Sequence, residues 1–464
     1  MLVCFFVSLG YHEDAMYSFV VSILVSLFGA TIFHFIGNKA DNTMSRRDAF
    51  LVVTLSWSFF SLFGSLPFLI GGYIDNFTNA YFETMSGFTT TGATIFDDVE
   101  DLPRGILFWR SFTQWIGGLG IVFFTIAVLP SLVGGSVKVF TAEATGPIKS
   151  KLHPKLSTSA KSIWVIFFTL SIACVASYKV LGMNWFDSIN YSMTTIATGG
   201  FSTHNASIEY FNNPALEYVS TLFCFISGIN FILLYRFIIR REAKSFFTNS
   251  ELKFYMFMVA LFTSFITIML VVSNDYDIEH AFRCGIYQVV SFITTTGLFN
   301  DDAAKWPHVT WVVLAVCMFM GACAGSTSGG FKSIRCVMLL KVIRNEFRQM
   351  LHPKAVLPLR FAGANVPMQH RVTLLAFLSV YCLLCIVCAF SMIAAGVDNT
   401  NAITITISTL SNVGPTLGLE IGPTMSWNQL PDFAKWICSI LMLMGRLEIF
   451  SVLIIFTPTF WQDR

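Results

Sequence analysis

The chain has 464 residues, of which 55% are hydrophobic and only 12% are charged. Soluble proteins carry about 25% charged residues, so this composition excludes an ordinary soluble domain and indicates a protein surrounded mostly by lipid. The formal net charge of +2 favours no class of partner, and no nucleic-acid partner is expected.

Long apolar runs follow one another along the chain. A membrane-spanning helix needs about 20 mostly apolar residues. Residues 1–9 are apolar but too few to cross, and they lack the basic start and the cleavage site of a signal peptide. We expect them to be the stub of a truncated helix. The predicted spans are 16–36, 50–72, 106–130, 160–182, 214–239, 252–273, 309–343, 372–396 and 434–457.

The charged residues indicate how the chain is oriented. If residues 12–14 lie outside and the spans alternate, most of the 29 basic residues fall inside, as the positive-inside rule requires. The outer loops are acidic and would concentrate cations at an outer mouth. The alternative is that these loops simply lack lysine and arginine. The acidic residues are Asp97, Asp98, Glu100, Asp101, Asp275, Asp277, Glu279, Asp301 and Asp302.

Four short segments repeat one pattern, a polar turn followed by about twelve helix-like residues and a glycine. The glycines are Gly92, Gly199, Gly297 and Gly414. Each segment lies between two predicted spans. A helix of twelve residues reaches only about 18 Å and cannot cross, so each segment must re-enter the membrane. Non-helical backbone at this depth is tolerated only where protein buries it or water fills the space.

These repeats predict the fold class, an all-α integral membrane protein with four M1–P–M2 pore repeats around one central pore. One additional N-terminal helix and the truncated stub precede them. The predicted divisions are an N-terminal helix region (1–45), repeat 1 (46–135), repeat 2 with its preceding cytoplasmic loop (136–245), repeat 3 with a gating loop (246–348) and repeat 4 (349–464).

The loops that end the short helices suit a potassium ion. Backbone carbonyls can replace the water around K⁺ without a formal charge that would trap it. Glycine lets successive carbonyls face one axis, and the helix C-termini supply partial negative charge. The predicted selectivity filter comprises Thr91, Gly92, Ala93, Thr198, Gly199, Gly200, Thr296, Gly297, Leu298, Val413, Gly414 and Pro415.

The predicted span 309–343 is too long for a single crossing. As a straight helix its 35 residues would extend about 52 Å, against a hydrocarbon core of about 30 Å. Within it, no side chain of residues 321–330 is larger than threonine. We expect a helix, a mobile gating loop, and a basic helix starting near Lys332; a close-packed helix face is the alternative. The predicted gate comprises Gly321, Gly325, Ser326, Thr327, Ser328, Gly329, Gly330 and Arg446.

Arg446 lies deep within the last predicted span. A charge at mid-membrane costs about 2.5–3.5 kcal/mol and usually faces a cavity or a partner. We expect Arg446 to donate to carbonyls of the 321–330 loop and to latch it; an ion pair with a carboxylate on another helix is the alternative. Glu448 is not expected to be that partner. Glu83 is expected to cap or brace the first short helix.

The four glycine segments, WIGGLGI at 115–121, the run 321–335 and GRLEIFS at 445–451 together resemble the TrkH/KtrB superfamily of potassium-uptake subunits, most closely TrkH. The resemblance extends from about residue 18 to the end. It implies one pore per protomer in a homodimer, an intramembrane loop at 321–330 that blocks the pore, and control by a cytoplasmic TrkA-like nucleotide-binding ring. Glycine at position 92 favours potassium. TrkH members carry two helices before the first repeat, whereas this chain shows one and a stub.

We therefore expect potassium uptake across a bacterial inner membrane, with K⁺ bound by the backbone carbonyls of the filter and no nucleotide bound by this chain. Basic segments 138–161 and 332–360 are the expected docking sites for the regulatory subunit, although such segments also bind anionic lipid. A Na⁺- or H⁺-coupled symporter and a less selective K⁺/Na⁺ conductor are the alternatives. An enzyme is not expected, because no catalytic or nucleotide-binding motif occurs in a fitting context.

Overall fold

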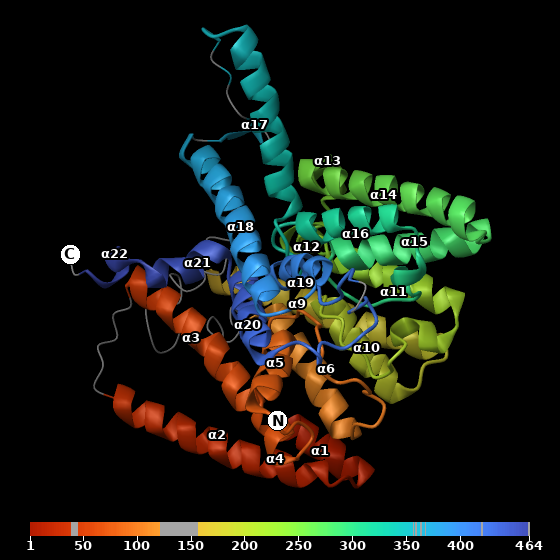
Figure 1. Ribbon diagram of the computed structural model, residues 1–464, viewed down its shortest axis with the longest axis vertical. Helices are drawn as coiled ribbons and strands as arrows, with labels where there is room; N and C mark the ends of the chain where they lie inside the picture. The colour runs from red at the N-terminus through yellow and green to blue at the C-terminus, as the bar shows by residue number, and fades with distance from the viewer. Residues whose placement is uncertain are drawn as a thin grey trace.

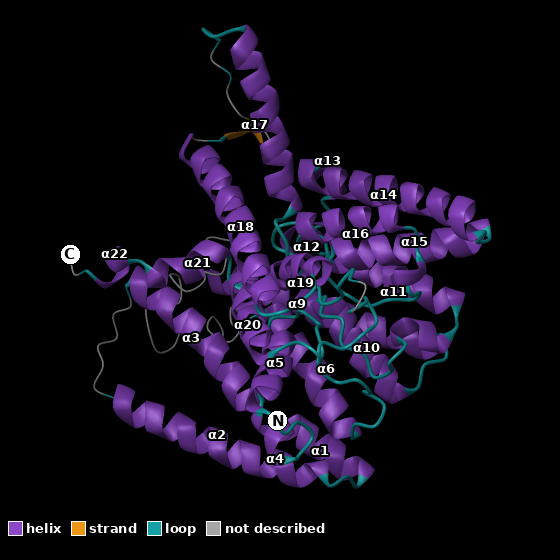
Figure 2. Ribbon diagram, viewed as in Figure 1, coloured by secondary structure: helices purple, strands orange, loops and turns teal. Residues whose placement is uncertain are grey.

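The computed structural model describes residues 1–38, 45–120, 156–355, 357, 360–361, 364–366, 368–418 and 421–462. Figure 1 and Figure 2 show that these residues are almost entirely helical. The only described strands are a two-residue antiparallel pair, β1 (Arg360–Phe361) and β2 (Ala364–Asn365). The all-α membrane class is therefore confirmed for the described part of the chain.

The chain begins with two helices and continues with a group of four. Most of the segment predicted as a stub, residues 2–9, belongs to a helix of ten residues. After this helix the chain turns directly into the long apolar helix Ala15–Gly37. The elements are α1 (Leu2–Tyr11), α2 (Ala15–Gly37), α3 (Arg46–Gly64), α4 (Leu66–Ile70), α5 (Phe77–Phe88) and α6 (Arg104–Leu119).

The middle of the chain repeats the order of long helix, short helix, loop and helix twice. Its elements are α9 (Leu156–Val180), α10 (Trp185–Ala197), η2 (Ser207–Phe211), α11 (Pro214–Ser227), α12 (Phe231–Ile238), α13 (Ala243–Thr248), α14 (Ser250–Asn274), α15 (Ile278–Ile293), η3 (Ala303–Lys305), α16 (His308–Met320) and α17 (Ser333–Leu351).

The last group follows the strand pair and shows the same order. Its elements are α18 (Met368–Ala394), α19 (Asn399–Ser411), α20 (Asp432–Arg446), α21 (Ile449–Leu453), η4 (Ile454–Phe456) and α22 (Pro458–Trp461). The first and last groups lie side by side, since Trp427 N donates to Thr94 O (2.8 Å) and the rings of Tyr81 and Trp436 are 5.0 Å apart. The chain thus closes on itself around a centre.

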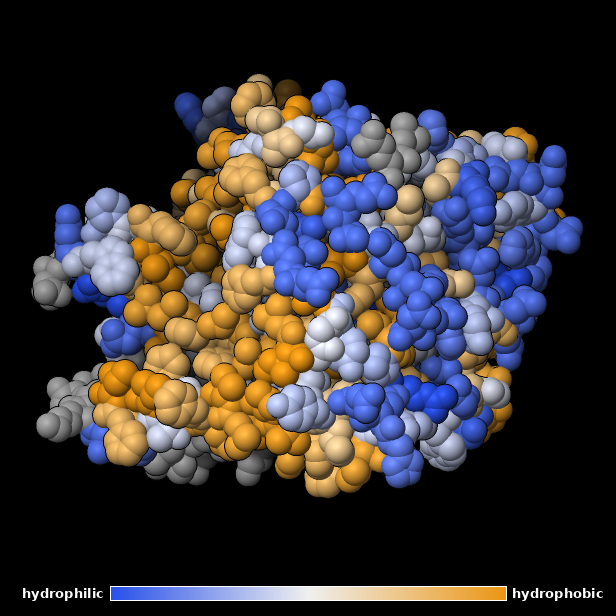
Figure 3. All heavy atoms as spheres, turned by 60° about the horizontal axis from the view of Figure 1, so that its bottom comes forward, coloured by the Kyte–Doolittle hydropathy of each residue, from blue (hydrophilic) through white to orange (hydrophobic). Residues whose placement is uncertain are grey.

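Apolar helices surround that centre. Within the described residues, five helices are long and apolar enough to span a membrane, or up to seven if each of two bent pairs counts as one. Large apolar side chains such as Leu24, Phe28 and Phe390 are exposed on them, as lipid contact requires. Figure 3 shows a broad hydrophobic area on one part of the surface and hydrophilic side chains gathered on another.

Two spans predicted as continuous are broken in the structure. In 214–239, α11 and α12 meet at 105°; in 434–457, α20 and the helix after it meet at 113°. The side chain of Asn230 caps the new helix α12. At the second break Glu448 has a φ of 66°, a conformation that interrupts an α-helix. Each bent pair is apolar enough on average to pass as one span, so mean hydropathy could not reveal the breaks.

The four short helices α5, α10, α15 and α19 have 12, 13, 16 and 13 residues. Side chains of Asn76, Asn184 and Asp398 accept backbone N–H groups at the starts of three of them. Each ends near a residue with left-handed φ, which directs the chain out of the helix. Those residues are Thr90 (52°), Thr198 (53°), Thr295 (55°) and Asn412 (56°).

Candidate functional site

The loops after the four short helices meet in one ring. We call residues 90–93, 198–201, 295–298 and 412–415 the four-loop ring. One glycine in each loop has a positive φ: Gly92 (87°), Gly200 (86°), Gly297 (78°) and Gly414 (99°). Side chains rarely adopt such φ values, so the backbone alone already favours glycine at these four positions.

The same glycines are also required by close approach between neighbouring loops. A Cβ on Gly92 would lie within 3.0 Å of Gly199 O, and a Cβ on Gly200 would lie equally close to Thr296 O. A Cβ on Gly297 would meet Val413 O, and one on Gly414 would meet Thr91 O. Each loop thus touches the carbonyl of the next, and the fourth loop returns to the first. The contacts form a closed cycle of four carbonyls.

The cycle corrects the sequence alignment of the second loop. In the sequence alignment, Thr198 and Gly199 correspond to the threonine–glycine pairs of the first and third loops and to the valine–glycine pair of the fourth. The structure instead places Gly199 and Gly200 there, and Thr198 takes the left-handed position of Thr90. Because residues 199 and 200 are both glycine, the sequence offered no means of choosing between the two registers.

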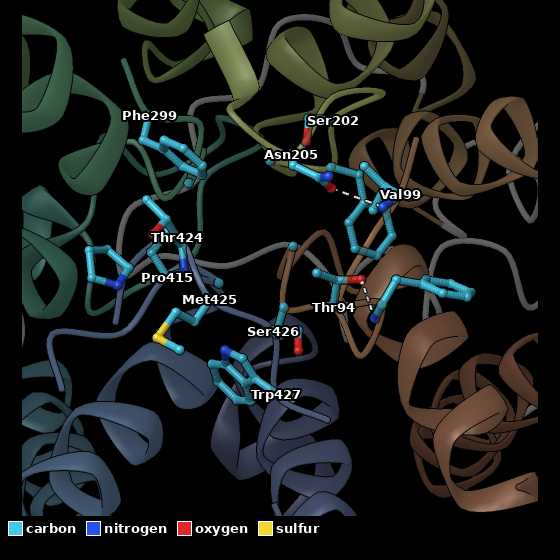
Figure 4. Close-up of a pocket in the computed structure, with 18 of the residues that line it drawn as sticks. Thr94, Val99, Ser202, Asn205, Phe299, Pro415, Thr424, Met425, Ser426 and Trp427 are labelled. Atoms are coloured by element: carbon cyan, nitrogen blue, oxygen red, sulfur yellow. Dashed lines mark hydrogen bonds between the residues drawn. The ribbon is translucent and has the colours of Figure 1, made fainter. Parts of the chain in front are cut away.

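The residues after the ring glycines are buried, including Ala93, Leu298 and Pro415, all named by the sequence analysis. In the second loop the corresponding residue is Phe201, which that analysis missed because of the register. A hollow of about 620 Å³, partly open to solvent, lies over the ring. Figure 4 shows side chains from four separate segments around it, among them Thr94, Phe299 and Met425.

The predicted acidic residue Asp97 lines this hollow, and Asp98 follows it in the chain. Asp97 accepts hydrogen bonds from Ser426 and, at 3.0 Å, from Asn428 Nδ2, which links the first group of helices to the last. Asp98 accepts from Asn205 Nδ2 at 2.8 Å, and this bond lowers the pKa of the Asp98 carboxyl. Hydrogen bonds thus hold both carboxylates in place.

A buried ion pair braces the first two loops. Glu83 accepts from Arg110 Nε at 2.8 Å and from Ile95 N at 2.9 Å. Arg110 also donates to Ser202 O at 3.1 Å and lies over the ring of Phe201. Glu83 therefore braces the loop after its helix as well as the neighbouring loop. Glu83 thus bonds to the loop and to Arg110 and does not cap its own helix, and the bracing role of Arg110 was not predicted from the sequence.

The segment between α16 and α17 is a loop that lies directly against the ends of three short helices. Gly329 N donates to Thr295 Oγ1 (2.7 Å), and Gly330 N donates to Ser411 O (2.9 Å). Thr327 Oγ1 donates to Ile196 O (3.2 Å). The loop, residues 321–332, thus contacts the ring from the side of the helix C-termini. Helix α17 begins at Ser333, close to the expected Lys332.

Glycines permit the path of the 321–332 loop. Gly321, Gly325 and Gly330 all have positive φ values. The loop residues Gly329, Thr327 and Ser328 are buried, whereas Gly325 and Ser326 are less so. Lys332, a buried residue with positive φ, donates to Ser328 O. The final lysine of the loop therefore folds back on it, a contact not predicted from the sequence.

Arg446 lies at the C-terminal end of α20 and contacts the 321–332 loop. Its Nη1 donates to Thr327 O at 2.8 Å, and its Nη2 donates to Gly117 O on α6. Glu448 pairs with Arg335 of α17 instead. A second hollow of about 610 Å³ lies here, lined by Ser328, Lys332 and Arg446 among others.

The chain is similar to known proteins of one family. A profile of the TrkH family, described as cation transport proteins, matches residues 12–463. The Trk system potassium uptake protein TrkH of Halomonas elongata is 37% identical over 458 residues, 98% of this chain and 94% of that protein. The protein of the same name from Escherichia coli is 37% identical over 472 residues, which cover 100% of this chain and 96% of that protein.

The fold agrees with these relatives. The crystal structure of the potassium transporter TrkH from Vibrio parahaemolyticus superimposes with a TM-score of 0.88 at 36% identity, covering 99% of this chain and 96% of that one. The chain therefore belongs to the TrkH family, whose members are multi-pass inner-membrane transporters and not enzymes.

Proposed function

We propose that this chain takes up potassium through the four-loop ring, which serves as a selectivity filter lined by backbone carbonyls. The observation that carries the proposal is the closed cycle in which each ring glycine touches the carbonyl of the next loop. Relatives at 37% identity over nearly the whole chain are named potassium uptake proteins, which supports the choice of ion.

The chemistry of the ring suits a monovalent cation in transit. Ring residues 90–93, 198–201, 295–298 and 412–415 contain no charged side chain. Carbonyl dipoles would replace the hydration shell of K⁺ without holding the ion tightly. The C-termini of four short helices point partial negative charge toward the same place. Asp97 and Asp98 at the rim would raise the local cation concentration.

The 321–332 loop and Arg446 form the proposed gate. The loop contacts the ends of α10, α15 and α19, and the guanidinium of Arg446 holds it by the carbonyl of Thr327. A positive charge below a cation filter opposes passage. Opening would require the bond between Arg446 and Thr327 O to break and the loop to withdraw into the second hollow.

A cytoplasmic TrkA-like nucleotide-binding ring is the proposed regulator, and the proposed assembly is a homodimer with one pore in each protomer. Helix α17 carries Arg335, Lys341, Arg344 and Arg348 and projects from the body in Figure 1. Because α17 directly follows the 321–332 loop, a force on α17 would reach the gate. Of the other expected docking segment, 138–161, residues 138–155 lie outside the described residues.

The test is uptake in bacterial cells that lack their own potassium transport. The chain should restore growth at low potassium and should carry Rb⁺ in clear preference to Na⁺. Gly92→Ala should abolish Rb⁺ uptake, because its Cβ would overlap Gly199 O. Gly10→Ala is the matched control, since a Cβ there meets nothing within 4 Å. Equal Rb⁺ and Na⁺ influx, or full uptake by Gly92→Ala, would refute the proposal.

A further inference from the structure

The second loop of the ring differs from the others at the position before its glycine. That position carries a side chain in three loops, Thr91, Thr296 and Val413, but in the second loop it is Gly199. In the first and third loops the threonine hydroxyl lies 2.8 Å from Thr89 Oγ1 and 2.7 Å from Thr294 Oγ1, respectively. The fourth loop makes no such bond but fills the position with Val413, whereas Gly199 offers neither a hydroxyl nor a side chain to fill the space.

A side chain from another helix occupies the missing space. A Cβ built on Gly199 would lie within 3.0 Å of Gln114 Oε1 and Cδ. Gln114 belongs to α6 and is completely buried. Gly199, unlike Gly200, is not in the positive-φ region, so its backbone would tolerate a side chain if Gln114 were absent. The amide of Gln114 therefore stands where the side chain of residue 199 would be.

Helix α6 approaches the second loop closely because of its glycine pair. A Cβ on Gly117 would lie within 3.0 Å of Phe88 O, at the end of α5. A Cβ on Gly118 would lie equally close to Ala197, at the end of α10. The pair lets α6 fit between the ends of two short helices. Gln114 lies about one turn earlier on α6, where it reaches the loop that follows α10.

The amide of Gln114 makes two hydrogen bonds to the second loop. Its Nε2 donates to Gly199 O at 2.6 Å, and its Oε1 accepts from Phe201 N at 3.0 Å. The two bonds fix the orientation of the amide, because only this arrangement pairs donors with acceptors. Four carbonyls occupy this position in the described loops, and only Gly199 O accepts a hydrogen bond from a described side chain. The other three are those of Thr91, Thr296 and Val413.

We propose that Gln114 is a positioning residue of the filter, which replaces the missing side chain of the second loop and fixes the direction of the Gly199 carbonyl. The inference rests on the proposed function and adds to it a determinant of ion selectivity outside the four loops. Without Gln114 the Gly199 carbonyl could rotate and the cavity beside it could admit water. Either change would weaken discrimination between K⁺ and the smaller, more strongly hydrated Na⁺.

The first test removes the amide and keeps its volume. Gln114→Met should lower the ratio of Rb⁺ to Na⁺ influx by roughly tenfold, the factor that corresponds to one buried hydrogen bond. Gln114→Glu keeps an acceptor for Phe201 N but loses the donor to Gly199 O, and should lower the ratio as well. An unchanged ratio in both variants, at normal abundance in the membrane, would overturn the inference.

A buried glutamine elsewhere provides the control. Gln288 Nε2 donates to Asp301 O at 2.9 Å, outside the four-loop ring. Gln288→Met removes a comparable buried bond and should change the Rb⁺ to Na⁺ ratio by less than about twofold. An equal loss of selectivity in Gln288→Met would show that any buried bond near the loops matters, and would overturn the specific role of Gln114.

The second test is reciprocal rescue, which also covers the case in which a single variant fails to fold. Gly199→Ser alone would collide with Gln114, and Gln114→Ala alone would leave a space. Gln114→Ala combined with Gly199→Ser restores a side chain at the position of Thr91, Thr296 and Val413, with a small shift from the Cβ of residue 114. Because Ala197 stands where the first and third loops have Thr89 and Thr294, this side chain supports the loop by filling the space, as Val413 does in the fourth loop. The double variant should regain most of the selectivity lost by Gln114→Ala.

A double variant no more selective than Gln114→Ala would contradict the inference. The outcome is distinguishable from failure of the proposed function itself. If the unaltered chain carries no Rb⁺, or carries Rb⁺ and Na⁺ equally, the filter proposal fails. If the unaltered chain is selective and the Gln114 variants remain so, the inference about Gln114 alone fails.

Discussion

The four-loop ring and the 321–332 loop beneath it are built in different ways. The ring uses four similar segments whose glycines and carbonyls contact one another in a closed cycle. The level below uses a single loop held by the side chains of Arg446 and Lys332. Backbone contacts in a cycle are hard to change singly, whereas side-chain contacts to one loop can break and reform. We therefore propose that ions are selected in the ring and that their flow is controlled below it.

The largest expected effect comes from breaking the ring. Gly200→Ala should reduce Rb⁺ uptake by more than about a hundredfold, since it combines an unfavourable φ of 86° with overlap on Thr296 O. The measurement is initial Rb⁺ influx at matched membrane abundance. The structure, and not the sequence alignment, makes Gly200 the ring glycine of the second loop. Substantial uptake by this variant would therefore favour the sequence alignment, in which Gly199 is the ring glycine.

The buried pair behind the ring should show the next largest effect. Glu83→Gln or Arg110→Met leaves one charge buried without its partner, which typically costs about 3–5 kcal/mol. Each single variant should melt well below the unaltered protein in detergent and should carry Rb⁺ several-fold more slowly. The measurement is thermal denaturation followed by size-exclusion chromatography.

The double variant of this pair sharpens the interpretation. Glu83→Gln together with Arg110→Met removes both charges and should be less destabilised than the sum of the two single variants. Strict additivity would mean that the two side chains stabilise the loops independently. The 2.8 Å contact between them would then have no energetic role.

The smallest expected effect lies at the outer mouth. Asp97→Asn should lower initial Rb⁺ influx by about twofold at 10 mM ionic strength and by much less at 150 mM, because salt screens the attraction of cations. The measurement is influx at low Rb⁺ across that range of salt. A loss that is independent of salt would indicate a structural role through Ser426 and Asn428 instead.

Much of this arrangement could be predicted from the sequence, for reasons of local pattern. The apolar runs, the short helices and the string of small residues at 321–330 are all contiguous. The depth of Arg446 follows from its place in a run, and the structure brings it to Thr327 O. Such features depend on neighbouring residues and on the thickness of the bilayer.

The remaining features depend on contacts between segments far apart in the chain. The choice of Gly200 over Gly199 is decided by Thr296 O, almost a hundred residues away. The bonds of Gln114 and Arg110 to the second loop likewise join positions that no local pattern connects. The sharp bends at residues 228–230 and 447–448 fall inside segments whose mean hydropathy still meets that of a single span, although Asn230, Arg446 and Glu448 lie at the bends. Hydropathy alone therefore joined the helices on either side.

The most direct test of the division between selection and control is Arg446→Ala, measured as paired Rb⁺ and Na⁺ influx in cells that lack the regulatory subunit. Removing the guanidinium releases Thr327 O and leaves the ring unaltered. Rb⁺ influx should therefore rise several-fold while the ratio of Rb⁺ to Na⁺ stays that of the unaltered chain. Unchanged or reduced Rb⁺ influx at normal abundance, or a ratio that falls toward one, would contradict the account.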